Sequence, residues 1–232
     1  GGLKAAVLYL TSASERDVND LGESLKLLDR HLQRVFGPYP VVVFHDGLSD
    51  SQMGRLLNQT SGHLVKPSFE LISLSMPPDG GGPLEVHDKY LGYGMGYRGM
   101  CRFFSGGVYD HPAVRSLDYY MRLDVDSFLL KDFEYDPFAY LHGEGKVYGY
   151  LTTGVEAGEF AIDLWPTVQA YLRSRNLPPR LPPRFSDADG RWDLSFYYTN
   201  FEVSRVDIWR SDEFKGLLSW LDAAGGFWGY RW

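Results

Sequence analysis

The first part of the chain alternates apolar runs with a helical pattern, in an order that limits the possible folds. Residues 3–10 form a mostly apolar run of strand length, and residues 11–14 supply turn and helix-capping side chains. From residue 18 to 36, apolar side chains recur every three or four positions, which predicts one buried helix face. Residues 41–44 form a second short apolar run. This order predicts a βαβ unit, and therefore an α/β fold with a parallel sheet covered by helices.

The pattern continues beyond this unit. A second helix is expected from near Ser49, with Asp50 and Ser51 as its capping residues. Apolar runs at 69–74 and 147–151 predict two further strands.

Less regular segments follow. Residues 89–93 and 97–104 are expected to form a helix lying across the sheet. The segment 77–83 is rich in Pro and Gly and is interpreted as a surface loop or a mobile lid, and 177–183 as a connector. Because no repeat or low-complexity tract interrupts the pattern, residues 1–232 are predicted to form a single domain.

Two aspartates one residue apart follow an apolar and aromatic run that begins at Tyr119. An unpaired carboxylate such as Asp124 or Asp126 is costly at the end of a buried strand, and a divalent cation removes that cost. Carboxylate oxygens suit hard ions such as Mg²⁺ or Mn²⁺, which keep positions open for water and phosphate oxygens. The pattern therefore indicates either a metal site that binds a diphosphate or an ordinary turn with solvated side chains.

Polar residues also follow the first two predicted strands. Thr11 and Ser12 end the first strand, and His45 and Asp46 end the second. In open α/β sheets, ligands bind beyond the carboxyl ends of the strands. We therefore take Thr11, Ser12 and Asp46 as candidate nucleotide-binding residues, with a simple turn as the alternative at 45–46.

Charge and composition exclude some classes of protein. The net charge of −7 argues against a nucleic-acid partner, because backbone binding needs clustered Lys and Arg. The single cysteine, Cys101, excludes an internal disulfide and a cysteine-based zinc site. The 36 aromatic residues suit a large core and a groove that stacks on sugar rings.

Targeting signals are sparse. Neither a secretory signal nor an apolar run of membrane-spanning length is visible, so we expect membrane attachment only through an N-terminal anchor outside this sequence. The tripeptide Asn58-Gln59-Thr60 is a glycosylation sequon in a polar stretch interpreted as a loop. It gives weak support for a secretory lumen.

Three segments together resemble glycosyltransferase family 15, the fungal Golgi α-1,2-mannosyltransferases. Residues 97–106 are similar to the family's Tyr-Arg-x-Met-Cys-Arg-Phe-x-Ser-Gly, and His-Pro-Ala follows at 111–113. Residues 119–126 stand where the family reads Tyr-x-Trp-Arg-Val-Glu-Pro-Asp. The Asn-Phe-Glu at 200–202 and the segments at 209–211 and 221–227 match later family motifs in the same order.

The resemblance implies a GT-A glycosyltransferase fold, an α/β fold with a mixed, mostly parallel sheet flanked by helices. It also implies transfer of α-mannose from GDP-mannose, with retention, to a glycan or glycoprotein acceptor. It also implies a divalent cation, usually Mn²⁺, and a location in the Golgi lumen or elsewhere in the secretory pathway. Two alternatives remain open at this point. The same fold can use another nucleotide-sugar donor such as a UDP-sugar, or the chain can be a catalytically weak domain that binds a glycan or nucleotide.

Carried over by position, the resemblance assigns roles to individual residues. Asp124 and Asp126 match the metal-binding carboxylates, and Glu202 matches the carboxylate placed near the anomeric carbon. Glu202 acts either as a nucleophile or by binding a hydroxyl and stabilising oxocarbenium charge. The candidate substrate-binding residues are Tyr97, Arg102, Arg122, Tyr198 and Asn200. For each arginine the alternative is a structural ion pair, and for the tyrosines a place in the core.

The chain also departs from the family pattern. Asp124 replaces a longer Glu, and Val125 replaces a Pro. After Gly229 the family continues with Gly-Asp-Ala-Pro and a His that completes the metal site, whereas this sequence ends at Trp232. We expect either that the catalytic domain lacks the family's C-terminal segment here, or that another group completes the metal coordination.

Overall fold

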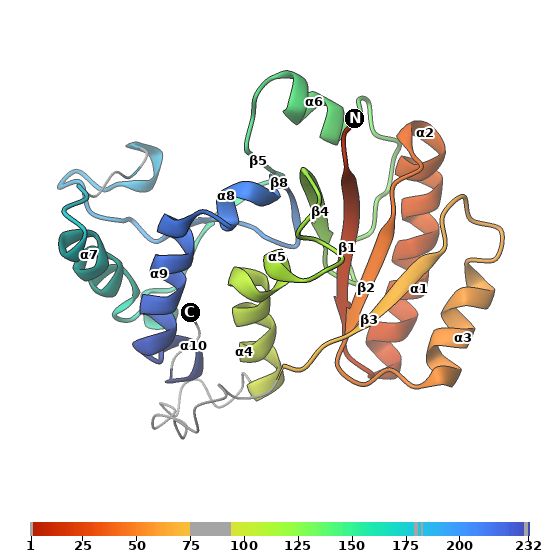
Figure 1. Ribbon diagram of the computed structural model, residues 1–232, viewed down its shortest axis with the longest axis horizontal. Helices are drawn as coiled ribbons and strands as arrows, with labels where there is room; N and C mark the ends of the chain where they lie inside the picture. The colour runs from red at the N-terminus through yellow and green to blue at the C-terminus, as the bar shows by residue number, and fades with distance from the viewer. Residues whose placement is uncertain (1, 75–93, 179–180, 182, 230–231) are drawn as a thin grey trace. The chain divides into compact units, whose positions relative to one another are not determined.

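The computed structural model describes residues 2–74, 94–178, 181, 183–229 and 232. The chain divides into two compact units (Figure 1). Unit 1 contains Gly1–Ser73, His111–Leu151 and Tyr198–Asp207, and unit 2 contains Leu74–Asp110, Thr152–Tyr197 and Ile208–Trp232. The segments 77–83 and 89–93 lie outside the described residues, as does part of 177–183.

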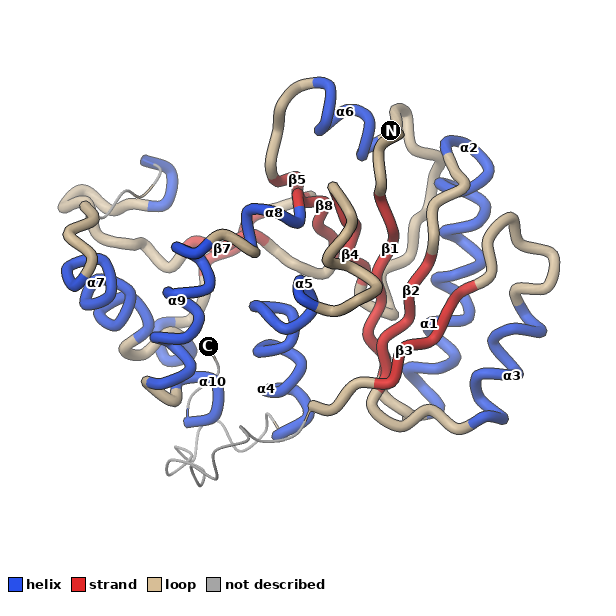
Figure 2. Tube along the Cα trace, viewed as in Figure 1, coloured by secondary structure: helices blue, strands red, loops and turns tan. Residues whose placement is uncertain are grey.

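Unit 1 is built on a six-stranded mixed sheet with the order β3-β2-β1-β4-β8-β5 (Figure 2). The strands β3, β2, β1 and β4 run parallel, and β8 is antiparallel to both of its neighbours. This arrangement confirms the expected mixed sheet. The strands are β1 (Ala5–Thr11), β2 (Val41–His45), β3 (Pro67–Leu71), β4 (Tyr119–Leu123), β5 (Tyr148–Tyr150) and β8 (Phe201–Arg205).

The predicted βαβ unit is confirmed, with one difference in its helix. The helix α1 (Glu15–Leu28) begins after Ser14, whose side chain accepts a hydrogen bond from the Asp17 amide. The sequence predicted one helix over 18–36, but a π-helical turn, Asp29–Gln33, separates α1 from the short α2 (Arg34–Phe36). The Asp29 carboxylate accepts a hydrogen bond from the Leu64 amide, a contact distant in sequence that no helical periodicity reveals.

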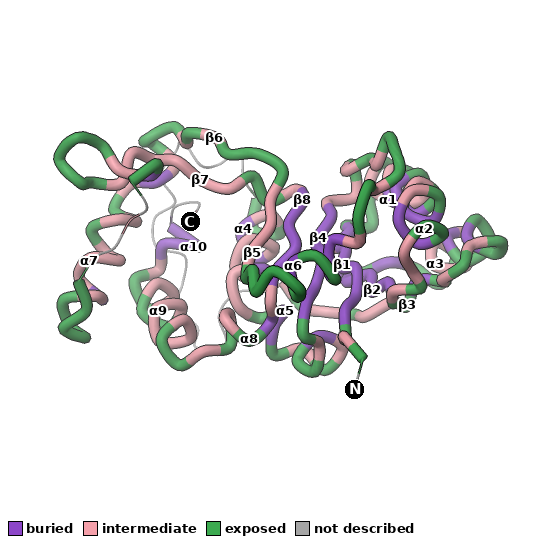
Figure 3. Tube along the Cα trace, turned by 90° about the horizontal axis from the view of Figure 1, so that it is seen from above, coloured by how far each residue is buried: buried purple, intermediate pink, exposed green. Residues whose placement is uncertain are grey.

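One face of the sheet packs on α1 to form the core of unit 1. Alternate side chains of β1, β4 and β8 meet Leu21, Leu25 and Leu28 there, and the central strands are buried along their length (Figure 3). Because side chains alternate across a strand, the residues between them point to the opposite face of the sheet. That second face carries Tyr120 and Arg122 of β4 with Glu202 of β8.

The helix α3 (Asp50–Gln59) corrects two expectations. Its N-cap is Ser49 rather than Asp50 or Ser51, and Ser49 forms a reciprocal capping box with Gln52. The sequon at residue 58 lies in the last turn of α3 rather than in a loop. Thr60 is fully buried and its hydroxyl donates to the Leu56 carbonyl, which ties this end of the helix to the fold.

The remaining helix of unit 1 is α6 (Pro137–Gly143), capped by Asp136. The predicted strands at 69–74 and 147–151 are present with shifted ends, as β3 and β5. The chain passes into unit 2 through the short α8 (Val206–Trp209).

Unit 2 is mainly helical. Its helix α9 contacts α7, α10 and the π-helical turn Phe103–Gly107 that follows α4. The expected helix at 97–104 is present, although it begins at Met95 and changes to a π-helical turn at Phe103, and its expected position across the sheet stays a prediction. The helices are α4 (Met95–Arg102), α5 (Val108–Asp110), α7 (Leu164–Ser174), α9 (Asp212–Ala223) and α10 (Gly226–Gly229), and β6 (Thr153–Val155) pairs with β7 (Ser195–Tyr197).

Candidate functional site

The two aspartates lie just after β4, in a tight turn beside β8. The Asp124 amide donates to the Asn200 carbonyl, and the Asp124 carbonyl accepts from the Ser127 amide. The Ser127 hydroxyl donates to the same Asn200 carbonyl at 2.8 Å. These bonds fix the turn, so the position of Asp124 is set by the backbone of two strands. Asp126 is exposed.

Arg122 connects the sheet to this turn. Its guanidinium is buried, and one nitrogen donates to Asp124 Oδ1 at 3.1 Å. The Asp124 side chain keeps 41% of its accessible surface, so its carboxylate can accept further ligands. The arrangement places a fixed positive charge next to a carboxylate that is still open to solvent.

The donor set fits a metal only in part. In the described ranges, no three or more His, Cys, Asp or Glu side chains gather closely enough to form a metal site. Asp124 and Asp126 offer two accessible carboxylates one residue apart. Mg²⁺ and similar hard ions are often held by one or two carboxylates and complete their coordination with substrate phosphates and water. The two residues therefore suit a cation that arrives with a diphosphate.

Glu202 is buried on β8, with 5% of its surface accessible. It pairs with Arg122 across the β4–β8 ladder, so the two side chains share a face of the sheet. Its two carboxylate oxygens accept hydrogen bonds from the hydroxyls of Tyr120, at 2.8 Å, and Tyr148, at 2.6 Å. Sequence reasoning missed both tyrosines, because Tyr148 meets Glu202 from a strand 54 residues away.

Neighbouring strand ends carry the candidate nucleotide-binding residues. Thr11 of β1 pairs with His45 of β2, and Asp46 follows directly with an exposed side chain. The Thr11 hydroxyl donates to the Ser12 carbonyl at 2.9 Å. The Ser12 hydroxyl donates to Asp17 at 2.5 Å, so it helps to organise the start of α1.

His45 is buried at the end of β2 and has a defined structural contact. Its Nδ1 accepts a hydrogen bond from the Leu48 amide at 3.1 Å. Burial lowers the pKa of the imidazole, against a smaller opposing effect from Asp46 and Glu70. His45 therefore supports the turn that follows β2, which is the structural interpretation of this position.

Two further candidates lie at the start of β8. The Tyr198 side chain is 47% exposed, so it lies outside the core that the alternative interpretation predicted. Asn200 is half-buried, and its carbonyl holds the turn at Asp124. Substrate binding by these two residues stays a prediction.

Arg102, in unit 2, makes an ion pair with Asp222 of α9. Its Nε and one terminal nitrogen donate to the two carboxylate oxygens at 2.7 and 2.6 Å. These hydrogen bonds raise the pKa of the guanidinium. This contact is the structural ion pair that the alternative interpretation described, and a role in substrate binding stays a prediction. Tyr97, also on α4, is half-buried.

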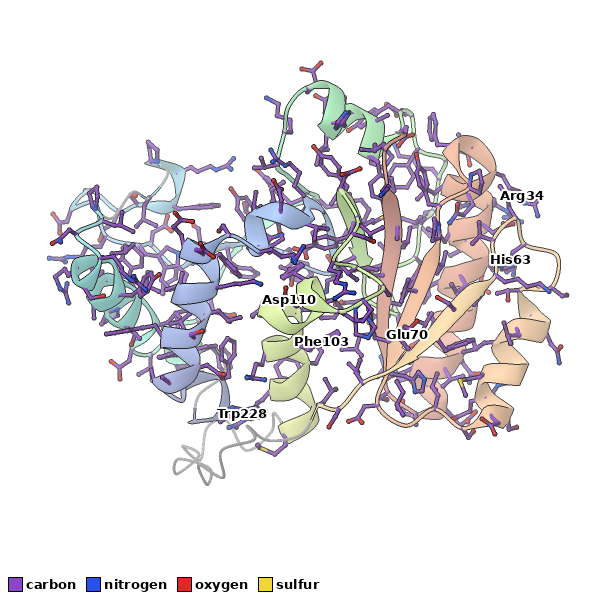
Figure 4. The ribbon with its side chains drawn as sticks, in the orientation of Figure 1. Arg34, His63, Glu70, Phe103, Asp110 and Trp228 are labelled. Atoms are coloured by element: carbon purple, nitrogen blue, oxygen red, sulfur yellow. The ribbon has the colours of Figure 1, made fainter. Side chains whose placement is uncertain are left out.

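The Arg102–Asp222 pair borders a cavity of about 280 Å³ within unit 2. Asp110, labelled in Figure 4, also lines this cavity. Its carboxylate accepts hydrogen bonds from Lys215 and Arg210. The bond from Lys215 is the main reason that the pKa of Asp110 is lowered. The cavity is therefore bordered by charges that already pair with one another.

The structure brings part of the predicted site together within unit 1. Arg122, Asp124, Asn200 and Glu202 lie on the adjacent strands β4 and β8 or at their ends. Thr11 and Asp46 end the neighbouring strands β1 and β2. Tyr97 and Arg102 belong to unit 2. His111 has a structural contact, because its Nδ1 accepts a hydrogen bond from the Ala113 amide.

Solved structures share this architecture. Core-mannan synthase A (CmsA/Ktr4) from Aspergillus fumigatus, solved in its Mn/GDP form, superposes with a TM-score of 0.78 at 21% identity, over 100% of this chain and 67% of that chain. The mannosyltransferase Ktr4p from S. cerevisiae in complex with GDP gives a TM-score of 0.80 at 20% identity, over 99% and 64%. The protein has the GT-A fold of nucleotide-sugar glycosyltransferases.

Sequence comparison identifies the family. A family model described as glycolipid 2-alpha-mannosyltransferase matches residues 85–232. O-glycoside alpha-1,2-mannosyltransferase omh1 of Schizosaccharomyces pombe is 30% identical over 97% of this chain and 60% of its own length. The chain belongs to this mannosyltransferase family, as the sequence motifs predicted, and spans about 60% of the length of that relative. Across the described residues, no helix is long and apolar enough to cross a membrane.

Proposed function

We propose that this chain carries the catalytic centre of a metal-dependent, retaining α-mannosyltransferase that uses GDP-mannose and a glycan or glycoprotein acceptor. Family membership supports the reaction class. The observation that carries the proposal is the buried carboxylate of Glu202, opposite Arg122 and next to the strand end that holds Asp124 and Asp126. We further propose that the protein acts in the Golgi lumen or elsewhere in the secretory pathway.

The hardest chemical demand of this reaction is the negative charge that develops on the departing nucleoside diphosphate. A bound divalent cation such as Mn²⁺ supplies Lewis-acid stabilisation of that charge. Asp124 and Asp126 are the residues that would hold the cation. Arg122 keeps Asp124 oriented through its hydrogen bond and adds a positive charge at the same strand end.

Glu202 is the carboxylate assigned to the sugar. Retention requires either that a carboxylate attacks the anomeric carbon and is then displaced by the acceptor hydroxyl, or that the acceptor attacks on the face from which the diphosphate leaves. In the first route Glu202 forms the covalent bond, and in the second its negative charge stabilises the oxocarbenium-like transition state. Its burial strengthens either effect, since electrostatic interactions are stronger away from water.

The other candidates complete the proposed binding site. Thr11 and Ser12 are assigned to the nucleotide because they lie at the end of β1, the parallel neighbour of β4, and Asp46 because it follows β2, the next strand along the sheet. Tyr198 and Asn200 are assigned to the substrate from the start of β8. We propose that units 1 and 2 act as one catalytic domain, in which Tyr97 and Arg102 of unit 2 also bind substrate.

A panel of nucleotide-sugars tests the donor. Thermal unfolding with Mn²⁺ should show stabilisation by GDP and GDP-mannose, by about 2.7 kcal/mol at a hundredfold excess over the dissociation constant. UDP-glucose and UDP-galactose should give no comparable shift. Turnover of each donor is measured in parallel. Selective stabilisation and turnover by a UDP-sugar would show that the donor assignment is wrong, and binding without turnover would show a binding domain.

A further inference from the structure

Two tyrosines hold the carboxylate of Glu202 from either side. The Tyr120 hydroxyl donates to Oε1 at 2.8 Å and the Tyr148 hydroxyl donates to Oε2 at 2.6 Å. Tyr120 is completely buried on β4, and Tyr148 is half-buried on the edge strand β5. Both oxygens of the carboxylate are therefore engaged at the same time, by donors from different strands.

The sheet register explains why both hydroxyls reach the same side chain. Strand β8 lies between β4 and β5, and both Tyr120 and Tyr148 pair with Ser204. Ser204 lies two residues beyond Glu202 on β8, so all four side chains share one face of the sheet. The two tyrosine side chains then reach diagonally along β8, a distance that long aromatic side chains can span.

The two hydrogen bonds strongly restrict the conformation of the Glu202 side chain. A free Glu side chain samples many rotamers, but one donor on each oxygen fixes both the position and the plane of the carboxylate. An ionised carboxylate accepts about four hydrogen bonds, so each oxygen of Glu202 keeps capacity for another interaction. The tyrosines thus hold the Glu202 carboxylate and still leave each of its oxygens able to interact with another group.

We propose that Tyr120 and Tyr148 are positioning residues for the reaction, which hold the Glu202 carboxylate in one orientation toward the sugar. This inference rests on the proposed function, because it assigns the tyrosines an effect only through Glu202. A group that is already oriented stabilises developing charge without reorganising during the reaction. Neither tyrosine needs to touch the substrate to act in this way.

The matched control is Tyr119, the neighbour of Tyr120 on β4. Its hydroxyl also makes one hydrogen bond, to the Lys146 carbonyl at 3.1 Å, but its side chain lies in the core on the other face of the sheet. Tyr119→Phe therefore removes a comparable hydroxyl without affecting Glu202. Thermal unfolding of each variant shows that it is folded before rates are compared.

The test measures mannosyl transfer from GDP-mannose with Mn²⁺. Tyr120→Phe and Tyr148→Phe should each lower kcat on the order of tenfold to a hundredfold, as expected for a misplaced reacting group, with KM for GDP-mannose nearly unchanged. Tyr119→Phe should retain the wild-type kcat. In a Glu202→Asp background the shorter side chain should no longer reach the tyrosine hydroxyls. Tyr148→Phe should therefore cause little additional loss of kcat in that background.

The opposite results are equally informative. If both Tyr→Phe variants retain the kcat of Tyr119→Phe, or if Tyr148→Phe lowers kcat by the same factor in the Glu202→Asp background, the positioning role is wrong. The proposed function survives that outcome when Glu202→Gln still abolishes transfer. If the wild-type chain transfers no mannose, both the proposed function and the positioning role are overturned.

Discussion

The guanidinium of Arg102 and the carboxylate of Asp222 form a bidentate ion pair, with N–O distances of 2.7 and 2.6 Å. The pair connects α4 to α9, although 120 residues separate its two members in the chain. Parallel hydrogen bonds of this kind need the planar fork of arginine. The geometry therefore gives Arg102 a structural role in unit 2, whatever it does for substrate.

Replacing Arg102 should show how much stability this pair contributes. Arg102→Lys keeps the charge but loses the bidentate geometry, and we expect the free energy of unfolding to fall by about 1 kcal/mol, since the pair is partly exposed. Urea unfolding of Arg102→Lys, Asp222→Asn and the double variant measures the coupling. Strictly additive losses would show that the two side chains do not stabilise each other.

The approach of α4 to Leu74 predicts a marked difference between two glycines of the same helix. A Cβ on Gly99 would lie 2.4 Å from the Leu74 carbonyl oxygen, whereas a Cβ on Gly96 would meet no atom within 4 Å. Gly99→Ala should therefore lower the free energy of unfolding by about 1–3 kcal/mol through overpacking. Gly96→Ala should be neutral or stabilising by up to about 1 kcal/mol. Equal effects in urea unfolding would contradict this packing.

The capping box of α3 can be tested with two serines. Ser49→Ala removes the hydroxyl that accepts a hydrogen bond from the Gln52 amide, and the free energy of unfolding should fall by about 1 kcal/mol. Ser51→Ala, at the second residue of the helix, is the control and should have little effect on the free energy of unfolding. Chemical denaturation of both variants decides between them, and a larger loss for Ser51→Ala would favour the cap that the sequence alone predicted.

His45 predicts part of the pH dependence of stability. Burial lowers its pKa in the folded protein below the ordinary value of 6.5. Below that value the His45 imidazole binds a proton more readily in the unfolded chain than in the folded protein. The free energy of unfolding should therefore fall as the pH decreases from about 7 to 5, by at most about 1.4 kcal/mol per pH unit. His45→Asn keeps an acceptor for the Leu48 amide and should lose less stability over this range. Identical pH profiles for wild type and variant would rule out a contribution from His45.

Local patterns predicted the elements whose stabilising contacts are close in sequence. The strand, helix and strand from β1 to β2 are read from apolar spacing, because one buried face repeats with the period of its own element. The π-helical turn at Asp29–Gln33 was missed because apolar spacing does not distinguish it from an α-helix, and one of its contacts, from the Leu64 amide to Asp29, comes from a distant segment. The cap of α3 was missed for a different reason, because Ser49, Asp50 and Ser51 are all acceptable capping residues and the contact that distinguishes Ser49 is its reciprocal box with Gln52.

The candidate site also contains residues that a local sequence pattern reveals and residues that only distant contacts reveal. Asp124 and Asp126 stand out in the sequence because two carboxylates follow an apolar strand. Tyr120 and Tyr148 carry no such signal, since each looks like an ordinary core aromatic until β8 is placed between their strands. Antiparallel pairing of distant strands depends on the whole sheet, so no local pattern could connect Tyr148 to Glu202.

The most direct test of the account is metal-dependent mannosyl transfer by wild type and Asp126→Ala, measured with GDP-mannose and a mannoside acceptor. We predict transfer with Mn²⁺, loss of transfer on chelation with recovery when Mn²⁺ is restored, and a loss on the order of a hundredfold or more in Asp126→Ala. Glu134→Ala removes another exposed carboxylate of unit 1 and should keep the wild-type rate. Transfer that persists unchanged in the presence of chelator and in Asp126→Ala would contradict the metal site at the end of β4.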